Sequence, residues 1–244
     1  MITDILTVQW KEMKELFFQR GRFRGGVTGM LFFVAVFGIF LPLQSGRDWV
    51  ESPVGLVYWC WVPFLLVSSV VADAFAGERE RHTLETLLAS RLPDQAILIG
   101  KLAASIAYGW GLTLACVLLG LVSINFAYGR GQLLLYPWKI SLGMMVLSFL
   151  VAALAASLGM LVSLRAATVR QAQQTFSIAF FVLFIPLFMF PMLPAEWKLK
   201  VAQVVEKINI ETAAMAVISL LLLVDCILVA LTFARFKRDK LILD

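Results

Sequence analysis

The sequence predicts an all-α integral membrane protein, and three observations support this. Hydrophobic residues make up 61% of the 244 residues and charged residues only 15%, with a mean hydropathy of +0.88. So few polar side chains cannot cover a soluble globule of this size. The chain also contains six long apolar runs. The alternating pattern of a membrane β-barrel is missing, so helices must satisfy the backbone inside the bilayer.

The first 24 residues predict an amphipathic helix in the membrane interface. Apolar side chains recur near one helical face while Lys and Glu residues lie off it, as in helices that bury one side in the headgroup region. That face carries Ile2, Ile5, Leu6, Met13, Leu16 and Phe17. The helix is either an anchor before the first span or a contact for a partner, and the sequence leaves both interpretations open.

Six apolar runs follow, each about 17 residues or longer. At 1.5 Å per residue, a helix of that length crosses a hydrocarbon core of roughly 30 Å. The predicted spans cover residues 27–43, 54–76, 100–127, 140–164, 172–193 and 212–234. Prolines 186, 191 and 194 predict a bent outer half of the fifth span, and a short re-entrant or interfacial segment before the sixth. We expect one membrane domain over residues 1–244.

Small residues predict where these helices pack closely, because small faces let backbones approach in a membrane. They recur at four-residue steps in the third and fourth spans. The two sets are Ala103, Ala107, Gly111 and Ala115, and Ser148, Ala152, Ala155, Ala156 and Gly159.

The basic residues predict the orientation. Most of the 21 Lys and Arg residues fall near the two ends of the chain and after the second and fourth spans, and cytoplasmic segments are enriched in these residues. We therefore expect cytoplasmic N- and C-termini, a cytoplasmic loop at residues 77–99, and a multi-pass protein in the inner (plasma) membrane. The net charge of +5 indicates topology and contact with anionic lipid, and gives no reason to expect a nucleic acid partner.

The cytoplasmic loop predicts a short amphipathic helix. Leu84, Leu87 and Leu88 stand at positions i, i+3 and i+4, which places them in one apolar stripe. Pro93 cannot continue that helix, and Asp94 is placed to cap the next one. A solvated hairpin is the simpler interpretation. The leucine stripe favours contact with another protein, because it would otherwise stay exposed in water.

Residues 78–101 contain E-x-E, then T-L-E-x-L-L, then Pro, then G-K at the start of the third span. With this pattern the loop resembles that of the membrane subunits of ABC-2-type exporters, also called type V ABC transporters, although His82 stands where many relatives have Gly. The resemblance implies a coupling helix seated on a separate ABC ATP-binding subunit, and a dimer with a second copy or a homologous permease. The implied contact residues are Glu78, Glu80, Arg81, Thr83, Leu84, Glu85, Leu87 and Leu88.

The chain has no ATP site of its own. A P-loop around Gly100 and Lys101 would need Gly at position 95 and Ser or Thr at 102, where the residues are Gln95 and Leu102. ATP and Mg²⁺ are therefore expected on the partner subunit, and the chain is not expected to be an enzyme by itself. The three cysteines lie within predicted spans without metal-ligand spacing, so no metal site is expected.

Asp225 is the one acidic residue near the middle of a predicted span. Such a carboxyl is either a protonated hydrogen-bonding group or faces a wet cavity or pathway, and both stay open. Two other functions compete with the exporter. An intramembrane enzyme would need a second catalytic group at the same depth, and an ATP-independent channel or secondary carrier would need no ATPase contact.

Overall fold

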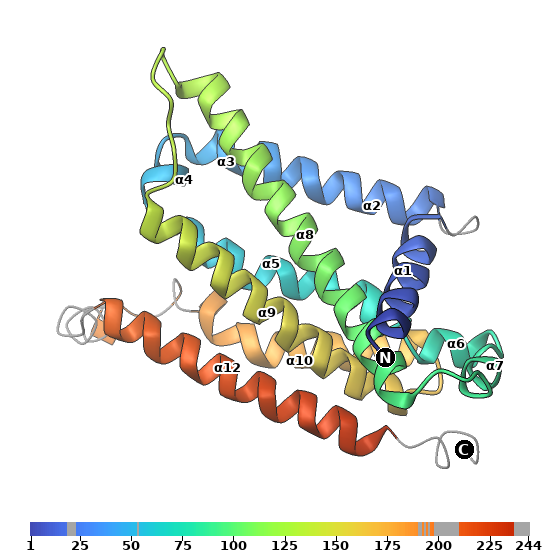
Figure 1. The fold of residues 1–244 in the computed structure, drawn as a ribbon. Coiled ribbons are helices and arrows are strands. Elements are labelled where there is room, and N and C mark those ends of the chain that lie inside the picture. Colours follow the sequence, from blue (N-terminus) through green and yellow to red (C-terminus); the bar gives the residue numbers. More distant parts are fainter. Residues whose placement is uncertain are drawn as a thin grey trace.

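The computed structural model is described for residues 1–18, 23–52, 54–189, 192, 194, 196–197 and 210–236. Within these residues the chain forms helices and no strand, so the predicted all-α class is confirmed. The helices pass back and forth between two ends of an elongated bundle (Figure 1). One end carries α1, α6 and α7, and the other carries α4 and the connection between α8 and α9.

Helix α1 (Ile2–Phe18) lies against the first part of α8 (Asp94–Tyr128). Gly100 makes this approach possible, because a Cβ there would lie 2.7 Å from the Val8 side chain. Val8 is buried at this contact, while Ile2 and Leu6 are exposed. Of the predicted apolar face, Ile2 and Leu6 therefore point away from the bundle, whereas Ile5, Met13 and Leu16 are half-buried.

The first predicted span is a run of helix with one widened turn. Helix α2 (Phe23–Ala35), a π-helix (Val36–Phe40) and α3 (Leu41–Ser45) follow each other without a break. At the π-helical turn the Ser123 hydroxyl of α8 donates to the Gly38 carbonyl at 3.1 Å. A π-turn leaves carbonyls without their usual i+4 partner, and a side-chain donor satisfies one here. Helix α4 (Asp48–Glu51) then turns the chain back.

The second predicted span ends earlier than the sequence indicates. Helix α5 (Val54–Val71) stops before the predicted end at Ala76. The backbone turns there because the Ser163 hydroxyl of α9 accepts from the amides of Phe75 and Ala76, both at 3.0 Å, and donates to the Ala72 carbonyl at 3.1 Å. A hydroxyl from a distant helix thus replaces the bonds that α5 would have made by continuing.

The loop after α5 contains two short helices where the sequence predicts one. They are α6 (Ala76–Glu80) and α7 (Leu84–Leu88), separated by a turn at residues 81–83. Pro93 has extended backbone and occupies the N-cap of α8, so Asp94 is the first helical residue and the prediction that it forms the cap is wrong.

Three helices are long and apolar enough to cross a membrane, judged over the described residues: Asp94–Tyr128, Trp138–Arg165 and Thr212–Arg235. They correspond to α8, α9 (Trp138–Arg165) and α12 (Ile210–Arg235), and to the third, fourth and sixth predicted spans. Helix α10 (Val169–Met189) corresponds to the fifth predicted span and includes Pro186. The predicted break at Pro191 and most of the segment before the sixth span lie outside the described residues.

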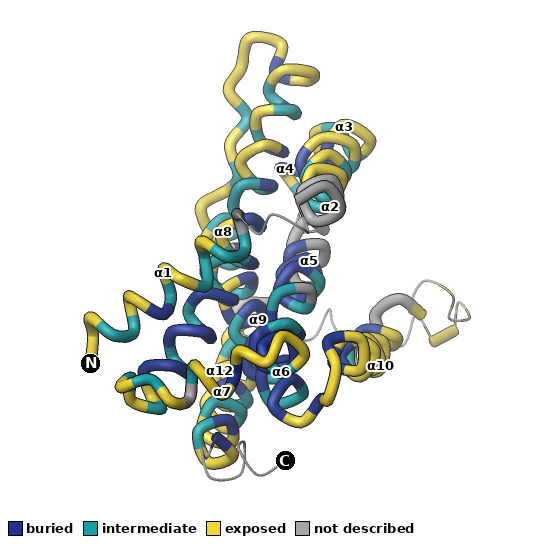
Figure 2. Tube along the Cα trace, turned by 90° about the vertical axis from the view of Figure 1, so that its right-hand side faces the viewer, coloured by how far each residue is buried: buried dark blue, intermediate teal, exposed yellow. Residues whose placement is uncertain are grey.

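Helix α9 is the centre of the bundle and packs against α5, α8 and α12. The predicted small face of α9 is confirmed, since Ala152, Ala155 and Ala156 are buried and Gly159 lies against Val71 of α5. The predicted face of α8 is wrong at Gly111, which is exposed with open space around it, whereas a Cβ at Gly109 would overlap Val67. Buried residues gather around α5, α6 and α9, and exposed ones follow α10 and the outer half of α8 (Figure 2).

Candidate functional site

The loop between α5 and α8 meets the ends of several helices at one end of the bundle. Helices α1, α6 and α7 lie there beside the start of α8, and the C-terminal ends of α9 and α12 reach the same end (Figure 1). Three consecutive residues of α6, Glu78, Arg79 and Glu80, each bond to a different helix. This convergence makes the loop the candidate site.

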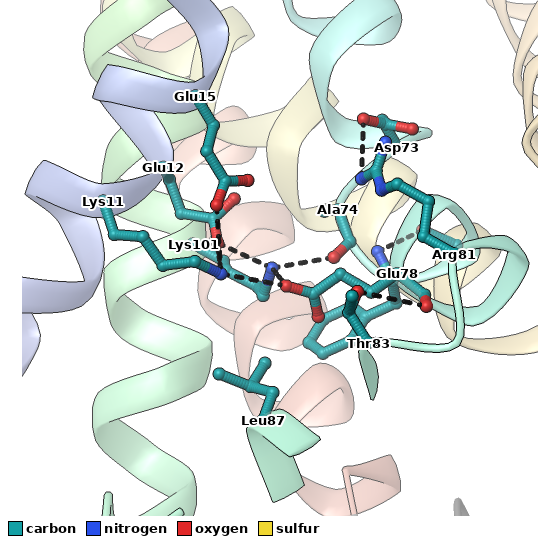
Figure 3. A network of polar contacts seen from close by, with 12 residues as sticks. Lys11, Glu12, Glu15, Asp73, Ala74, Glu78, Arg81, Thr83, Leu87 and Lys101 are labelled. Carbon is teal, nitrogen blue, oxygen red and sulfur yellow. Dashed lines mark hydrogen bonds and ion pairs between the residues drawn. The ribbon is translucent and has the colours of Figure 1, made fainter. Parts of the chain in front are cut away.

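Lys101 is the buried cation of the site. Its ammonium lies 2.8 Å from Glu12 Oε1, 3.0 Å from Glu78 Oε1 and 2.8 Å from the Ala74 carbonyl. The ammonium donates hydrogen bonds to Glu12 and to the Ala74 carbonyl, and it forms an ion pair with Glu78. The side chain is only 1% exposed, and Phe75 presents its ring face 5.2 Å away. One lysine thus joins α1, the turn after α5, α6 and α8 (Figure 3).

Lys11 extends this network to the surface. Its Nζ lies 3.3 Å from Glu78 Oε1, 3.4 Å from Glu15 and 3.6 Å from Glu12. Burial alone would lower the pKa of Lys11, but the attraction of Glu12, Glu78 and Glu15 outweighs it, and the pKa lies above its ordinary value of 10.5. Lys11 is therefore charged at neutral pH, and two lysines share the Glu78 carboxylate (Figure 3).

Arg79 and Glu80 bond to the connection between α9 and α10. The Arg79 guanidinium donates to the Ala166 carbonyl and, at 3.1 Å, to the Leu164 carbonyl. The Glu80 carboxylate accepts from the Val169 amide at 3.0 Å. A cation at a helix C-terminus and an anion at a helix N-terminus both interact favourably with the helix dipole. The two side chains therefore tie α6 to the end of α9 and the start of α10.

A second ion pair supports the bend between α5 and α6. Arg81 Nη2 lies 3.2 Å from Asp73 Oδ2. Gly77 leaves the room for this pair, because a side chain at that position would overlap the Asp73 carboxylate. Arg81 is exposed on its outer side, so it can pair with Asp73 and still face outward.

Helix α7 divides the predicted leucine stripe between the inside and the outside. Leu84 is 5% exposed and belongs to the chain's own core, and Leu87 is half-buried against that core. The side chain of Leu88 lies outside the described residues. Leu84 therefore anchors α7 to the bundle, and the expectation that the stripe stays exposed is wrong for it.

The outward surface of α7 is polar. Thr83 precedes the helix and its hydroxyl donates to the Glu78 carbonyl at 3.3 Å, while Glu85 and Thr86 are exposed. Together with Arg81 and His82 they form the outward face of the loop. Glu78, in contrast, is 4% exposed and reaches only other parts of this chain.

His82 joins the two short helices in an unusual conformation. Its φ of 55° lies in the left-handed region, where a side chain is disfavoured and Gly is not. The resemblance noted above has Gly at this position, and the backbone gives the physical reason. The turn lets α7 fold back so that Leu84 reaches the core.

Sequence reasoning did not place Glu12, Ser163 or the buried Lys101 in the site. The sequence did contain one signal for Lys101. This lysine stands three residues after Leu98 and four after Ile97, which places it on an apolar face of the helix. A lysine is buried on such a face only with an acidic partner. Glu12 and Ser163 are distant in sequence, and no local pattern links them to the loop. Asp225 lies apart from the site, buried on α12, and no bond joins it to the loop in the described part of the chain.

Comparison with known sequences decides the family. A family profile described as ABC-2 family transporter protein matches residues 65–241. The chain belongs to the ABC-2 transporter family. Members are membrane subunits without catalytic activity of their own, and an ATP-binding subunit is their general partner. The match includes the loop and the helices from α6 to α12, whereas the α1 residues of the candidate site, Lys11 and Glu12, precede it. No curated protein matches the chain.

Proposed function

We propose that this protein is the membrane subunit of an ATP-driven exporter and that residues 78–92 receive the movement of the ATP-binding subunit. The observation that carries this proposal is the double attachment of the loop. Its inner half is bonded to α1, α8, α9 and α10, and its outer half presents exposed polar side chains. A partner that shifts α7 therefore acts on the helices of the bundle through α6.

The same proposal fixes the topology. The helix from α2 to α3, together with α5, α8, α9, α10 and α12, would form six spans, with the loop in the cytoplasm. Basic residues support this orientation. The elements at the loop end carry Lys11, Arg79, Arg81, Arg91, Lys101, Arg165, Arg170 and Arg235, while the segments beside α4, between α8 and α9 and at the start of α9 carry Arg47, Arg130 and Lys139. ATP and Mg²⁺ would bind to the partner, and a second copy or a homologous permease would complete the pathway.

Capture from native membranes tests the partner. We expect tagged protein to bring down an ATP-binding subunit with ATPase activity. The Glu85→Arg variant should reduce that recovery and the transport-linked ATP hydrolysis at least several-fold, because Glu85 is exposed on α7. Glu51→Arg is the matched control, since Glu51 is also exposed and lies on α4, at the far end of the bundle. Leu87→Asp is less suitable, because Leu87 also packs against the core.

Photocrosslinking tests the surface directly. Benzoylphenylalanine at Thr86, an exposed position of α7, should capture the ATP-binding subunit. The same group at Leu133, which is 76% exposed at the far end, should not. Flux without ATP, together with no crosslink at Thr86, would replace the exporter with a channel or secondary carrier.

A further inference from the structure

Asp225 is a buried carboxyl group that the candidate site does not use. It stands near the middle of α12 and is 7% exposed, and neither oxygen has a hydrogen-bond partner among the described residues. Leu222, Leu223, Cys226 and Ile227 around it are exposed. The carboxyl therefore points to the narrow face of α12 that meets the bundle, where an unpaired charge is unfavourable.

The chemistry of a carboxylate limits what could bind it. A metal ion would need several ligands, and no group of three or more His, Cys, Asp or Glu side chains able to hold one occurs in the described part of the chain. Among the described residues of α9 and α12, the basic side chains are too far away. The basic residues of α9 and α12 lie at the helix ends, and Arg235 is about 15 Å along the axis from Asp225 at 1.5 Å per residue.

The contact between α9 and α12, called the α9–α12 seam below, can open to lipid. Helix α12 packs mainly against α9, and only 6% of its most apolar stretch is buried, against 56% for α9. Inside a bilayer the hydrophobic effect does not hold helices together. A membrane-dissolved molecule that binds at this seam would therefore enter from the exposed side of α12 and displace that helix from α9.

We propose that Asp225 binds the protonated nitrogen of a membrane-soluble amine at the α9–α12 seam. The ammonium would supply positive charge and N–H donors to both carboxylate oxygens, and charge-assisted hydrogen bonds of this kind are the strong ones. Its alkyl part would lie against Leu221, Val224 and Leu228, which are half-buried beside Asp225. That such amines are also transported rests on the proposed function, whereas binding does not.

Binding is tested on the purified chain in lipid nanodiscs, without an ATP-binding subunit. An alkylamine carrying a photoreactive diazirine is titrated, and labelled peptides from α9 and α12 are quantified by mass spectrometry. We expect saturable labelling that is at least about tenfold weaker in Asp225→Asn, the factor expected for loss of a charge-assisted hydrogen bond. Asp225→Glu should keep most of it.

Two controls make the result decisive. Thr232 is a buried polar residue of the same helix, and its hydroxyl donates to the Leu228 carbonyl. Thr232→Val should leave the labelling by the amine unchanged. The matched alkyl alcohol should label the seam equally in wild type and variant. Equal amine labelling in wild type and Asp225→Asn would overturn the proposal. If Asp225→Asn cannot be purified, the wild type alone tests the proposal. Equal labelling of the wild type by the alcohol and by the amine would then overturn it.

The outcome is separable from that of the proposed function. Absence of an ATP-binding partner would remove the exporter and leave amine binding in nanodiscs intact. Loss of the amine preference, with normal capture of the partner, would remove the site at Asp225 and leave the exporter.

Discussion

Helices α6 and α7 are neighbours of equal length, but α6 is largely buried in the bundle and α7 is largely exposed. Ala76, Gly77 and Glu78 of α6 are buried, and the side chains of that helix bond to α1, α8, α9 and α10. Helix α7 holds to the bundle mainly by Leu84 and presents Glu85 and Thr86 outward. One helix is fixed to its own chain, and the other presents exposed polar side chains.

This difference teaches what a coupling element requires. Coupling between distant sites needs an element with two discrete arrangements that both sites bias. A loop exposed throughout would bend under a partner without moving the bundle, and a loop buried throughout would offer no contact. The pairing of a fixed α6 with an outward α7 meets both needs, and each prediction below changes one half.

The largest loss of stability is expected on substitution of Lys101, because this lysine holds α6 to the bundle. Lys101→Met keeps the length of the side chain but leaves Glu12 and Glu78 without their buried cation. Loss of one partner of a buried ion pair costs about 3–5 kcal/mol. We expect a large drop in the temperature at which the purified protein loses its monodisperse peak on size exclusion. The exposed Lys14→Met should stay within about 0.5 kcal/mol, and equal loss in both variants would contradict the argument.

The second effect is expected at Ser163, where α6 begins. Ser163→Ala removes the acceptor of the Phe75 and Ala76 amides, and each buried amide left unpaired costs about 1–3 kcal/mol. Ser157→Ala is the matched control on the same helix, since its buried hydroxyl has no hydrogen-bond partner in the described residues. We expect Ser163→Ala to lower the thermal midpoint and Ser157→Ala to leave it unchanged or raise it. The opposite order would mean that the hydroxyl of Ser163 does not hold the turn.

Much of the fold followed from local patterns. Hydrophobic runs and small residues predicted α8, α9 and α12 and the packed face of α9, because these depend on residues that are close in sequence. Helix ends were less predictable. The end of α5 depends on Ser163, and the start of α8 extends outside the apolar stretch, so neither leaves a mark in local hydropathy.

The candidate site was predicted in place but only partly in role. Charges in the loop marked it as important, and the spacing of its leucines indicated a helix. Which charges face inward depends on α1 and α9, since Glu78 is buried only because Lys101 and Lys11 meet it there. The division between Leu84 inside and Glu85 outside likewise follows from the turn at His82.

A smaller effect is expected at the turn between the two helices. His82→Gly relieves a left-handed conformation that costs about 1–2 kcal/mol for an L-residue, and the entropy of glycine in the unfolded chain offsets about 0.5–1 kcal/mol of this. The variant should therefore be more stable by about 0.5 kcal/mol in thermal unfolding. Thr86→Gly, inside α7 with ordinary helical backbone, should be destabilised by a few tenths of a kcal/mol. Stabilisation by both substitutions would contradict the conformational explanation.

The smallest effect concerns Lys11 and appears only at high pH. Its pKa is raised above 10.5 in the folded protein, so its contribution to stability is complete below about pH 10.5 and is lost as the pH rises through the folded value. Because the Lys11 side chain is 45% exposed, solvent screening limits the contribution to a few tenths of a kcal/mol. The thermal midpoint of wild type should exceed that of Lys11→Met at pH 9, and the difference should shrink as the pH rises above 10.5. Lys11→Arg keeps its charge at these high pH values, so its thermal midpoint should stay above that of Lys11→Met. A difference between wild type and Lys11→Met that does not change with pH would assign the effect to packing of the lysine stem.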